Sequence, residues 1–265
     1  MSQERIPTSH AYGEAVDQFA ELYLPDGQRP RAGWPAVVLV HGGFWRHRYR
    51  LDLTAPLAED LVRHGLAVWN IEFRRVEGAG GWPETFEDVS AAIDHLAVPE
   101  VPVDHTRVIL VGHSAGGHLA LWAAGRTGLP PSAPGADVRV VPRGVVGLAP
   151  VADLRACHAS GLSDGAAEQL LGGDPRVVAE RWQVADPMHR VGHGIPMLLV
   201  HGHDDSDVPV AFSRDYAEAA RTAGDRVEVA FPAGDHMALI DPTSPAWSIA
   251  RRWIVDELGV DRLAG

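Results

Sequence analysis

The segment that most constrains the fold of this chain is residues 110–126, LVGHSAGGHLALWAAGR. Its pentapeptide Gly112-His-Ser-Ala-Gly116 follows the apolar run at 107–111 and leads directly into a helical pattern of Leu119, Ala120, Trp122 and Ala123. A strand, a tight glycine turn with serine at its apex, and a helix are the context in which G-x-S-x-G marks a nucleophile. The turn leaves no room for flanking side chains, so we expect Ser114 to be strained, with its hydroxyl projecting from the sheet edge.

A second copy of the pattern, Gly161-Leu-Ser163-Asp-Gly165, lies in a different context. The residues before it, 153–160, do not form a strand pattern and belong to a polar connection. The local context therefore favours Ser114 as the nucleophile and predicts that Ser163 is an ordinary turn or helix-cap serine.

Apolar, β-rich runs alternate with helical patterns along most of the chain. The pattern predicts strands at 19–24, 36–40, 67–71, 108–111, 144–148, 197–200 and 227–231, and helices at 55–64, 85–96, 115–126, 210–223 and 246–257. This alternation indicates an α/β fold with a mostly parallel sheet that is covered on both faces. Residues 150–195 interrupt it with short helical pieces, including 166–171 and 177–182, and we interpret them as a small helical cap within one domain, 1–265.

Composition limits the classes of function. The chain has 265 residues with 46% apolar content, no apolar run of 18 residues and no secretory leader pattern, so we expect one domain without a membrane partner. Its single cysteine, Cys157, suits the cytoplasm, and its formal charge of −12 argues against nucleic acid. All 23 basic residues are arginine, which excludes a P-loop and lysine-based catalysis. The pattern leaves the oligomeric state open.

A serine nucleophile needs a base and an acid that orients it. In a fold with this turn the partners follow in the order serine, carboxylate, histidine. Of the 14 histidines only His236 lies beyond residue 203, in a glycine-containing loop just after the last predicted strand. His236 is therefore the candidate base.

The candidate acid lies in the segment 201–209, HGHDDSDVP, directly after the apolar run at 196–200. Asp205 fits the common H-G-x-x-D-x-x-V-P spacing, and Asp204 and Asp207 flank it. Aspartates at such a place also shape loops and cap helices. Asp207, and Asp153 at the end of the preceding strand, remain alternatives to Asp205.

The segment His41-Gly-Gly-Phe-Trp45 ends the strand predicted at 36–40. Glycines there let the backbone approach the reaction centre, so the N–H groups of Gly43 and Phe44, with that of Ala115, are candidate oxyanion donors. Large apolar side chains near the motifs suggest an apolar or aromatic substrate pocket formed by Trp45, Trp82, Trp182 and Met237. The basic run 46–50 would attract a substrate carboxylate through Arg48, or would form a solvated face paired with acidic residues.

Together, HGGFW at 41–45, GHSAGG at 112–117, HGHDDSDVP and the late Gly-Asp-His236 resemble the α/β-hydrolase superfamily over essentially the whole chain. Within it they resemble small carboxylesterases and the kynurenine formamidase (arylformamidase) group, whose signature is H-G-G-x-W. The resemblance implies a Ser114–His236–Asp205 triad, with Gly43 and Phe44 in the oxyanion hole. It implies hydrolysis of a small carboxylic ester or aryl formamide through an acyl-enzyme, or specifically of N-formylkynurenine, without metal or organic cofactor.

Two rival classes have some support from the residues. A metal-dependent hydrolase would use His201-x-His203 with Asp204 and Asp205, although no third histidine follows at ligand spacing. A non-catalytic interaction module on a hydrolase fold would usually lack one member of the triad, and all three are present here in order.

Overall fold

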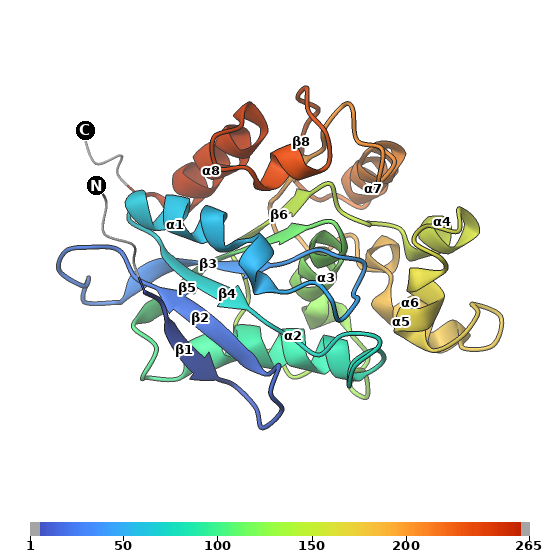
Figure 1. Cartoon of the computed structure of the whole chain (residues 1–265), viewed down its shortest axis with the longest axis horizontal. Helices are drawn as coiled ribbons and strands as arrows, with labels where there is room; N and C mark the ends of the chain where they lie inside the picture. The colour runs from blue at the N-terminus through green and yellow to red at the C-terminus, as the bar shows by residue number, and fades with distance from the viewer. Residues whose placement is uncertain (1–5, 261–265) are drawn as a thin grey trace.

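An eight-stranded sheet forms the centre of the molecule, whose computed structural model describes residues 6–260 (Figure 1). The strand order is β1-β2-β4-β3-β5-β6-β7-β8, and every neighbouring pair from β4 onward is parallel. β1 and β2 pair antiparallel, as do β2 and β4. The strands are β1 Thr8–Ala11, β2 Phe19–Tyr23, β3 Trp34–Val40, β4 Ala67–Ile71, β5 Val103–His113, β6 Gly144–Leu148, β7 Met197–Val200 and β8 Val227–Ala230.

Helices cover both faces of this sheet (Figure 1). The α-helices are α1 Ala55–Arg63, α2 Glu84–Asp94, α3 Ala115–Ala124, α4 Leu154–Ala159, α5 Ala166–Leu171, α6 Ala179–Ala185, α7 Ala211–Thr222 and α8 Pro245–Leu258. Two short 3₁₀ helices, η1 Leu51–Leu53 and η5 Met237–Ile240, lie close to the site described below.

The central strand β3 shows why the layers form. Its side chains alternate between the faces, so that Val38 and Val40 pack in the core on the side of α2, α3 and α7. Val37 and Leu39 pack on the other side, with α1 and α8. Both faces of the strand are buried, and this accounts for its continuous apolar sequence.

The sequence pattern predicts seven of these strands, and their cores lie where it places them. The edge strand β1 is not predicted because three of its four side chains are polar and most are exposed, so it lacks an apolar period. β5 begins at Val103, five residues earlier than predicted, in a partly exposed stretch. The helix predicted at 177–182 lies instead at Ala179–Ala185.

Residues 150–195 hold α4, α5 and α6, which gather at one side of the molecule (Figure 1). Leu170 and Trp182 of this segment are fully buried and belong to the same apolar core as α2 and α3. The assignment of the segment as a cap-like insertion stays a prediction. Within the described part of the chain, no helix combines the length and apolar character needed to cross a bilayer.

Candidate active site

Ser114 lies at the turn between β5 and α3 with φ 57° and ψ −120°, a strained conformation for a residue with a side chain. Its N–H donates to the Leu148 carbonyl at 2.8 Å, and its own carbonyl accepts from His118 and Val151, each at 3.1 Å. These three bonds hold the turn against β6 and the first turn of α3, and they fix the strained residue at the end of the sheet.

The glycines on either side of Ser114 are required by close backbone approach. A Cβ at Gly112 would overlap the carbonyl of Gly116, and a Cβ at Gly116 would overlap the carbonyl of Val40 in the neighbouring strand. The segment can therefore form this turn beside β3 only with hydrogen at both positions. Ser163 differs, because it lies in a turn at the surface of the 150–195 segment, where its carbonyl accepts from Arg46 at 2.6 Å. The structure confirms that Ser163 lies in a turn, where its φ is 49°, and does not follow a strand.

A cavity of about 160 Å³ lies beside Ser114. The residues that line it come from the loop after β3, from η1 and from the loops after β5, β7 and β8: Gly43, Phe44, Tyr49, Leu53, His113, Ser114, Asp207, His236, Met237 and Ile240. Ser114 and His236, which are 122 positions apart in the sequence, therefore share one wall. No hydrogen bond joins their side chains among the described residues, and catalytic hydrogen bonds often shorten only when substrate binds.

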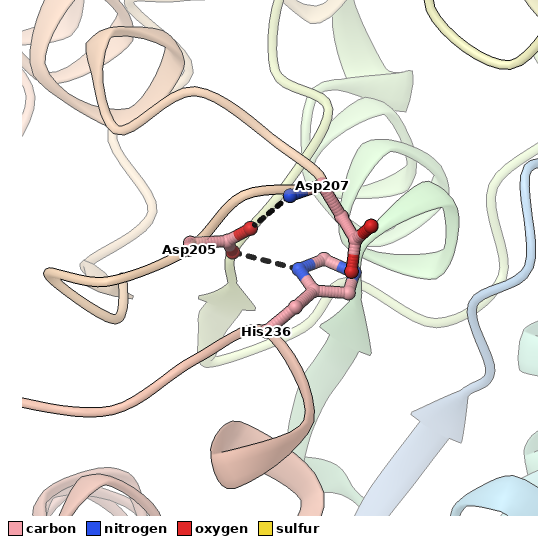
Figure 2. A group of neighbouring side chains, drawn as sticks. All are labelled: Asp205, Asp207 and His236. Atoms are coloured by element: carbon pink, nitrogen blue, oxygen red, sulfur yellow. Dashed lines mark hydrogen bonds and ion pairs between the residues drawn. The ribbon is translucent and has the colours of Figure 1, made fainter.

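His236 and Asp205 form the best-defined polar pair of the site. The His236 Nδ1–H donates to Asp205 Oδ2 at 2.7 Å, which leaves Nε2 of the neutral ring with a free lone pair (Figure 2). Asp205 Oδ1 accepts the backbone N–H groups of Asp207 and Val208, each at 2.9 Å. Burial alone would raise the pKa of Asp205, but the bonds from His201, His236 and Val208 lower it well below its usual range. Asp205 therefore stays an anion beside the imidazole.

His201 supports the same carboxylate from behind. Its Nε2–H donates to the Val208 carbonyl at 2.9 Å and lies 3.3 Å from Asp205 Oδ2, while its Nδ1 accepts from Ser213 Oγ at 2.7 Å. Both ring nitrogens are thus engaged, so His201 is not free to bind a metal. In the sequence, the only hint of this role is that His201 lies four positions before Asp205.

The loop after β3 places Gly43 and Phe44 in the cavity wall with φ 109° and 49°. In the part of the chain that the structure describes, the N–H groups of Gly43 and Phe44 make no turn hydrogen bond, nor does that of Ala115. Donors left free beside a serine hydroxyl are what an oxyanion site requires.

A buried ion network supports this loop, and the sequence pattern does not reveal it. His41 stacks on Phe73 with centroids 4.5 Å apart, and its Nε2 lies 3.0 Å from Glu72 Oε1. Glu72 is fully buried and also pairs with Arg75. Burial alone would raise the pKa of Glu72, but the bonds from His41 and Arg75 lower it to about 2. The first residue of the HGGFW segment is therefore tied to a permanent anion.

The alternative acids lie elsewhere or act otherwise. Asp153 accepts the Ala156 N–H at 2.7 Å as the N-cap of α4. Asp204 is exposed, and it accepts the Gly234 N–H at 3.2 Å. Asp207 lines the cavity, but within residues 6–260 its side chain makes no hydrogen bond to His236 like the 2.7 Å bond of Asp205. Of the four carboxyl groups, Asp205 has the geometry of an orienting acid.

One group of side chains could hold a metal ion within residues 6–260. One ligand atom each from Asp205, Asp207 and His236 lies within 4.8 Å of the others, and the imidazole lies between the two carboxyl groups (Figure 2). Asp205 and His236 already bind each other through Oδ2 and Nδ1, so an ion would have to use their remaining lone pairs. The metal site predicted as a rival, His201 with His203, is not assembled, because His201 is engaged and His203 is exposed.

The structure corrects the prediction for three of the four pocket residues. Trp45 is buried, with its indole N–H donating to His118 at 3.2 Å, and Trp182 is buried with its N–H on the Gly173 carbonyl. Trp82 lines a separate cavity with residues of α6. Only Met237 lines the cavity beside Ser114. Two of the tryptophans are core residues, and the third faces another part of the surface.

The basic run 46–50 does not line the cavity through an arginine. Arg46 pairs with Glu77 at 2.6 Å, and Arg50 lies 3.6 Å from Glu72. The Arg48 guanidinium lies over the Tyr49 ring, 4.8 Å from its centroid. Two of the three arginines thus follow the interpretation of a face paired with acidic residues.

Comparison with known proteins agrees with this architecture. The model of the BD-FAE family matches residues 20–219, a range that includes Ser114 and Asp205 and ends before His236. The chain belongs to the BD-FAE family. The structure of a truncated carbohydrate esterase from gut microbiota superposes with a TM-score of 0.80 at 20% identity, covering 97% of this chain and 99% of that one. The fold is the α/β-hydrolase fold, as the sequence predicts.

Two curated relatives resemble this member of the BD-FAE family in sequence. One is a probable isoprenylcysteine alpha-carbonyl methylesterase of Arabidopsis thaliana, 25% identical over 238 residues, which cover 84% of this chain. The other is the probable carboxylic ester hydrolase LipM of Mycobacterium tuberculosis, 29% identical over 198 residues, which cover 71% of it. The matches span 49% and 45% of those proteins, so this chain spans about half the length of each.

Proposed function

We propose that this protein is a serine carboxylesterase that cleaves small esters through an acyl-enzyme on Ser114. The observation that carries the proposal is one small cavity lined by both Ser114 and His236, with His236 oriented by Asp205. Membership of the BD-FAE family supports an ester as substrate, as do the two curated relatives, a probable methylesterase and a probable carboxylic ester hydrolase.

In the proposed mechanism, His236 Nε2 takes the hydroxyl proton as Ser114 Oγ attacks the ester carbonyl. Asp205 keeps the Nδ1–H tautomer in place and stabilises the imidazolium that forms. The N–H groups of Gly43, Phe44 and Ala115 bind the oxyanion, and one such donor is worth about 3 kcal/mol of transition-state stabilisation. His236 protonates the departing alcohol, and then activates the water that hydrolyses the acyl-enzyme.

The size of the cavity supports a short acyl group. Pockets for drug-sized ligands are roughly 300–1,000 Å³, whereas this one is about 160 Å³. Its wall is largely apolar, with Phe44, Leu53, Met237 and Ile240 around the serine. Acetyl to butyryl esters are therefore the substrates we propose.

Formamide hydrolysis would use the same residues, yet the observations favour esters. The carboxylate of N-formylkynurenine requires a cationic partner, and no arginine is among the residues that line the cavity. Arg48, the residue suggested for that role, lies over Tyr49 instead.

The test is a fluorophosphonate adduct measured by intact mass, with turnover of 4-nitrophenyl acetate. We expect one adduct on the wild type, and Ser114→Ala to lose both the adduct and about 10⁶-fold of turnover. The matched control is Ser163→Ala, which alters the second G-x-S-x-G and should keep both. Labelling or turnover that survives in Ser114→Ala would overturn the proposal.

A further inference from the structure

Asp207 adds a carboxylate to the wall of the Ser114 cavity that the proposed mechanism does not use. It follows Asp205 by two residues in the loop after β7, and Figure 2 shows its carboxyl group on the other side of the His236 ring from Asp205. One of its oxygens lies within 4.8 Å of a His236 ring nitrogen. A charged group of the chain thus lies directly beside the atoms assigned to catalysis.

The position of Asp207 is set by the loop and not by a partner of its side chain. Its N–H donates to Asp205 Oδ1 at 2.9 Å, and the N–H of Val208 donates to the same oxygen. Val208 is fully buried, so the loop is anchored on both sides of this turn. The Asp207 side chain itself is exposed and, within residues 6–260, makes no hydrogen bond or ion pair that would neutralise it.

No opposite charge in the cavity wall balances Asp207. Of the ten residues that line the cavity, it alone carries a carboxylate, and none carries a guanidinium. The arginines of the run 46–50 lie outside this set, and two of them face the acidic residues Glu77 and Glu72. The titratable groups that share the wall with Asp207 are His113, His236 and Tyr49.

Aromatic rings line the same cavity. Phe44 and Tyr49 belong to its wall; the Arg48 guanidinium lies over the Tyr49 ring, so Phe44 is the ring that we assign to a substrate cation. Aromatic faces together with a carboxylate are the chemistry that binds organic cations, including quaternary ammonium groups. They repel a carboxylate, because an anion would lose hydration here without gaining a partner.

We propose that Asp207 determines the charge specificity of this site, favouring esters with a cationic group near the scissile bond and rejecting those with an anionic group. This inference rests on the proposed esterase function. A unit charge about 5–8 Å away at a partly solvated surface changes kcat/KM by roughly 3- to 10-fold. Because Asp207 is exposed, salt should weaken the effect.

The experiment compares isosteric esters that differ in charge. Acetylcholine is paired with 3,3-dimethylbutyl acetate, its neutral isostere, and 4-nitrophenyl hemisuccinate is paired with the neutral 4-nitrophenyl 4-methylpentanoate. For the wild type we expect kcat/KM to favour the cation and disfavour the anion by about 3- to 10-fold each. In Asp207→Asn both ratios should move toward one, and 0.5 M NaCl should have the same effect on the wild type.

The control variant is Asp215→Asn, which removes an exposed carboxylate of α7 that is not among the lining residues. It should keep the ratios of the wild type. Ratios that stay unchanged in Asp207→Asn would overturn the inference, and so would a fall of about 10⁴-fold with every ester, which would make Asp207 the orienting acid. Fluorophosphonate labelling of each variant separates these outcomes from failure of the proposed function. If the proposed function failed, the activity would not depend on Ser114.

Discussion

The rings of His113 and His236 lie with centroids 4.4 Å apart, and the His113 Nε2–H donates to the His236 backbone carbonyl at 3.0 Å. His113 is the variable residue before Ser114 in G-x-S-x-G, so the turn that carries the proposed nucleophile also holds the loop of the proposed base. Burial, and to a smaller degree the adjacent His236 imidazole, lower the pKa of His113 to about 3. His113 is therefore neutral at physiological pH, and we infer that it positions the His236 loop.

Replacing His113 should lower turnover without greatly changing substrate binding. In His113→Phe the ring volume remains but the hydrogen bond to the His236 carbonyl is lost, and a displacement of about 1 Å at a catalytic group costs about 10²-fold. We expect kcat for 4-nitrophenyl acetate to fall about 10- to 100-fold with KM within about 3-fold. His113→Gln, which retains a donor, should recover part of this loss. Equal activity of Phe and Gln variants would show that the hydrogen bond has no role.

The choice of Asp205 over its neighbours predicts a sharp contrast between two adjacent carboxyl groups. Asp205→Asn removes the anion that accepts the His236 Nδ1–H, so the ring can take the wrong tautomer and kcat should fall by about 10⁴-fold. Asp204→Asn changes an exposed side chain and should leave kcat within about 3-fold. Steady-state kinetics on both variants measure this difference. Similar losses in the two would contradict the assignment of the acid.

The fold could be predicted well because its strands and helices follow simple periods. β6 and β7 are continuous apolar runs, β4 is interrupted only by the buried Asn70, and all three have the bounds that the pattern predicts. β1 could not be predicted because an exposed edge strand has no buried face to impose a pattern on its sequence. It pairs antiparallel with β2 at the edge of the sheet.

The candidate site likewise has one part that the sequence predicts and another that it does not. Ser114 and His236 line one cavity, as the sequence predicts. The turn motif identifies the serine from local sequence, and the order of the residues along the chain identifies the histidine. The pocket wall could not be predicted, because a tryptophan such as Trp182 is equally suited to a core or a pocket, and only tertiary packing decides. The buried anion Glu72 could not be predicted, because its partner His41 lies 31 residues away and no motif links the two positions.

Glu72 should stabilise the protein and the oxyanion loop together. It accepts bonds from His41, Arg75 and the Leu51 and Phe73 N–H groups, and Glu72→Gln would leave the buried Arg75 with less compensation. Breaking a buried ion pair typically costs about 3–5 kcal/mol. We expect a loss of this order in urea unfolding, accompanied by lower kcat. Glu77→Gln, whose ion pair with Arg46 is half exposed, is the control and should change stability by less than about 1 kcal/mol.

We expect the stability of the protein to depend on pH through Asp186, the residue that follows α6. Its carboxyl group is buried, Oδ1 accepts the Met188 N–H at 3.1 Å, and Oδ2 has no partner among the described residues. Burial, followed by the charge of Asp153, raises the pKa of Asp186 to about 6. Because the pKa of an unfolded aspartate is about 3.9, the folded state binds this proton more tightly. That stabilisation is complete below about pH 4 and is lost as the pH rises through 6.

Asp186→Asn should remove this dependence. An amide cannot ionise, so above pH 7 the variant should be more stable than the wild type by about 1–3 kcal/mol, while the two should converge near pH 4. Urea unfolding at pH 4, 6 and 8 measures the difference, since one carboxyl group alone changes between the two proteins. Asp241→Asn serves as the control: this carboxylate is exposed, and its pKa is lowered by bonds from Thr243, so its removal should not stabilise the protein at pH 8. A wild-type and Asp186→Asn difference that does not grow between pH 4 and pH 8 would contradict the raised pKa.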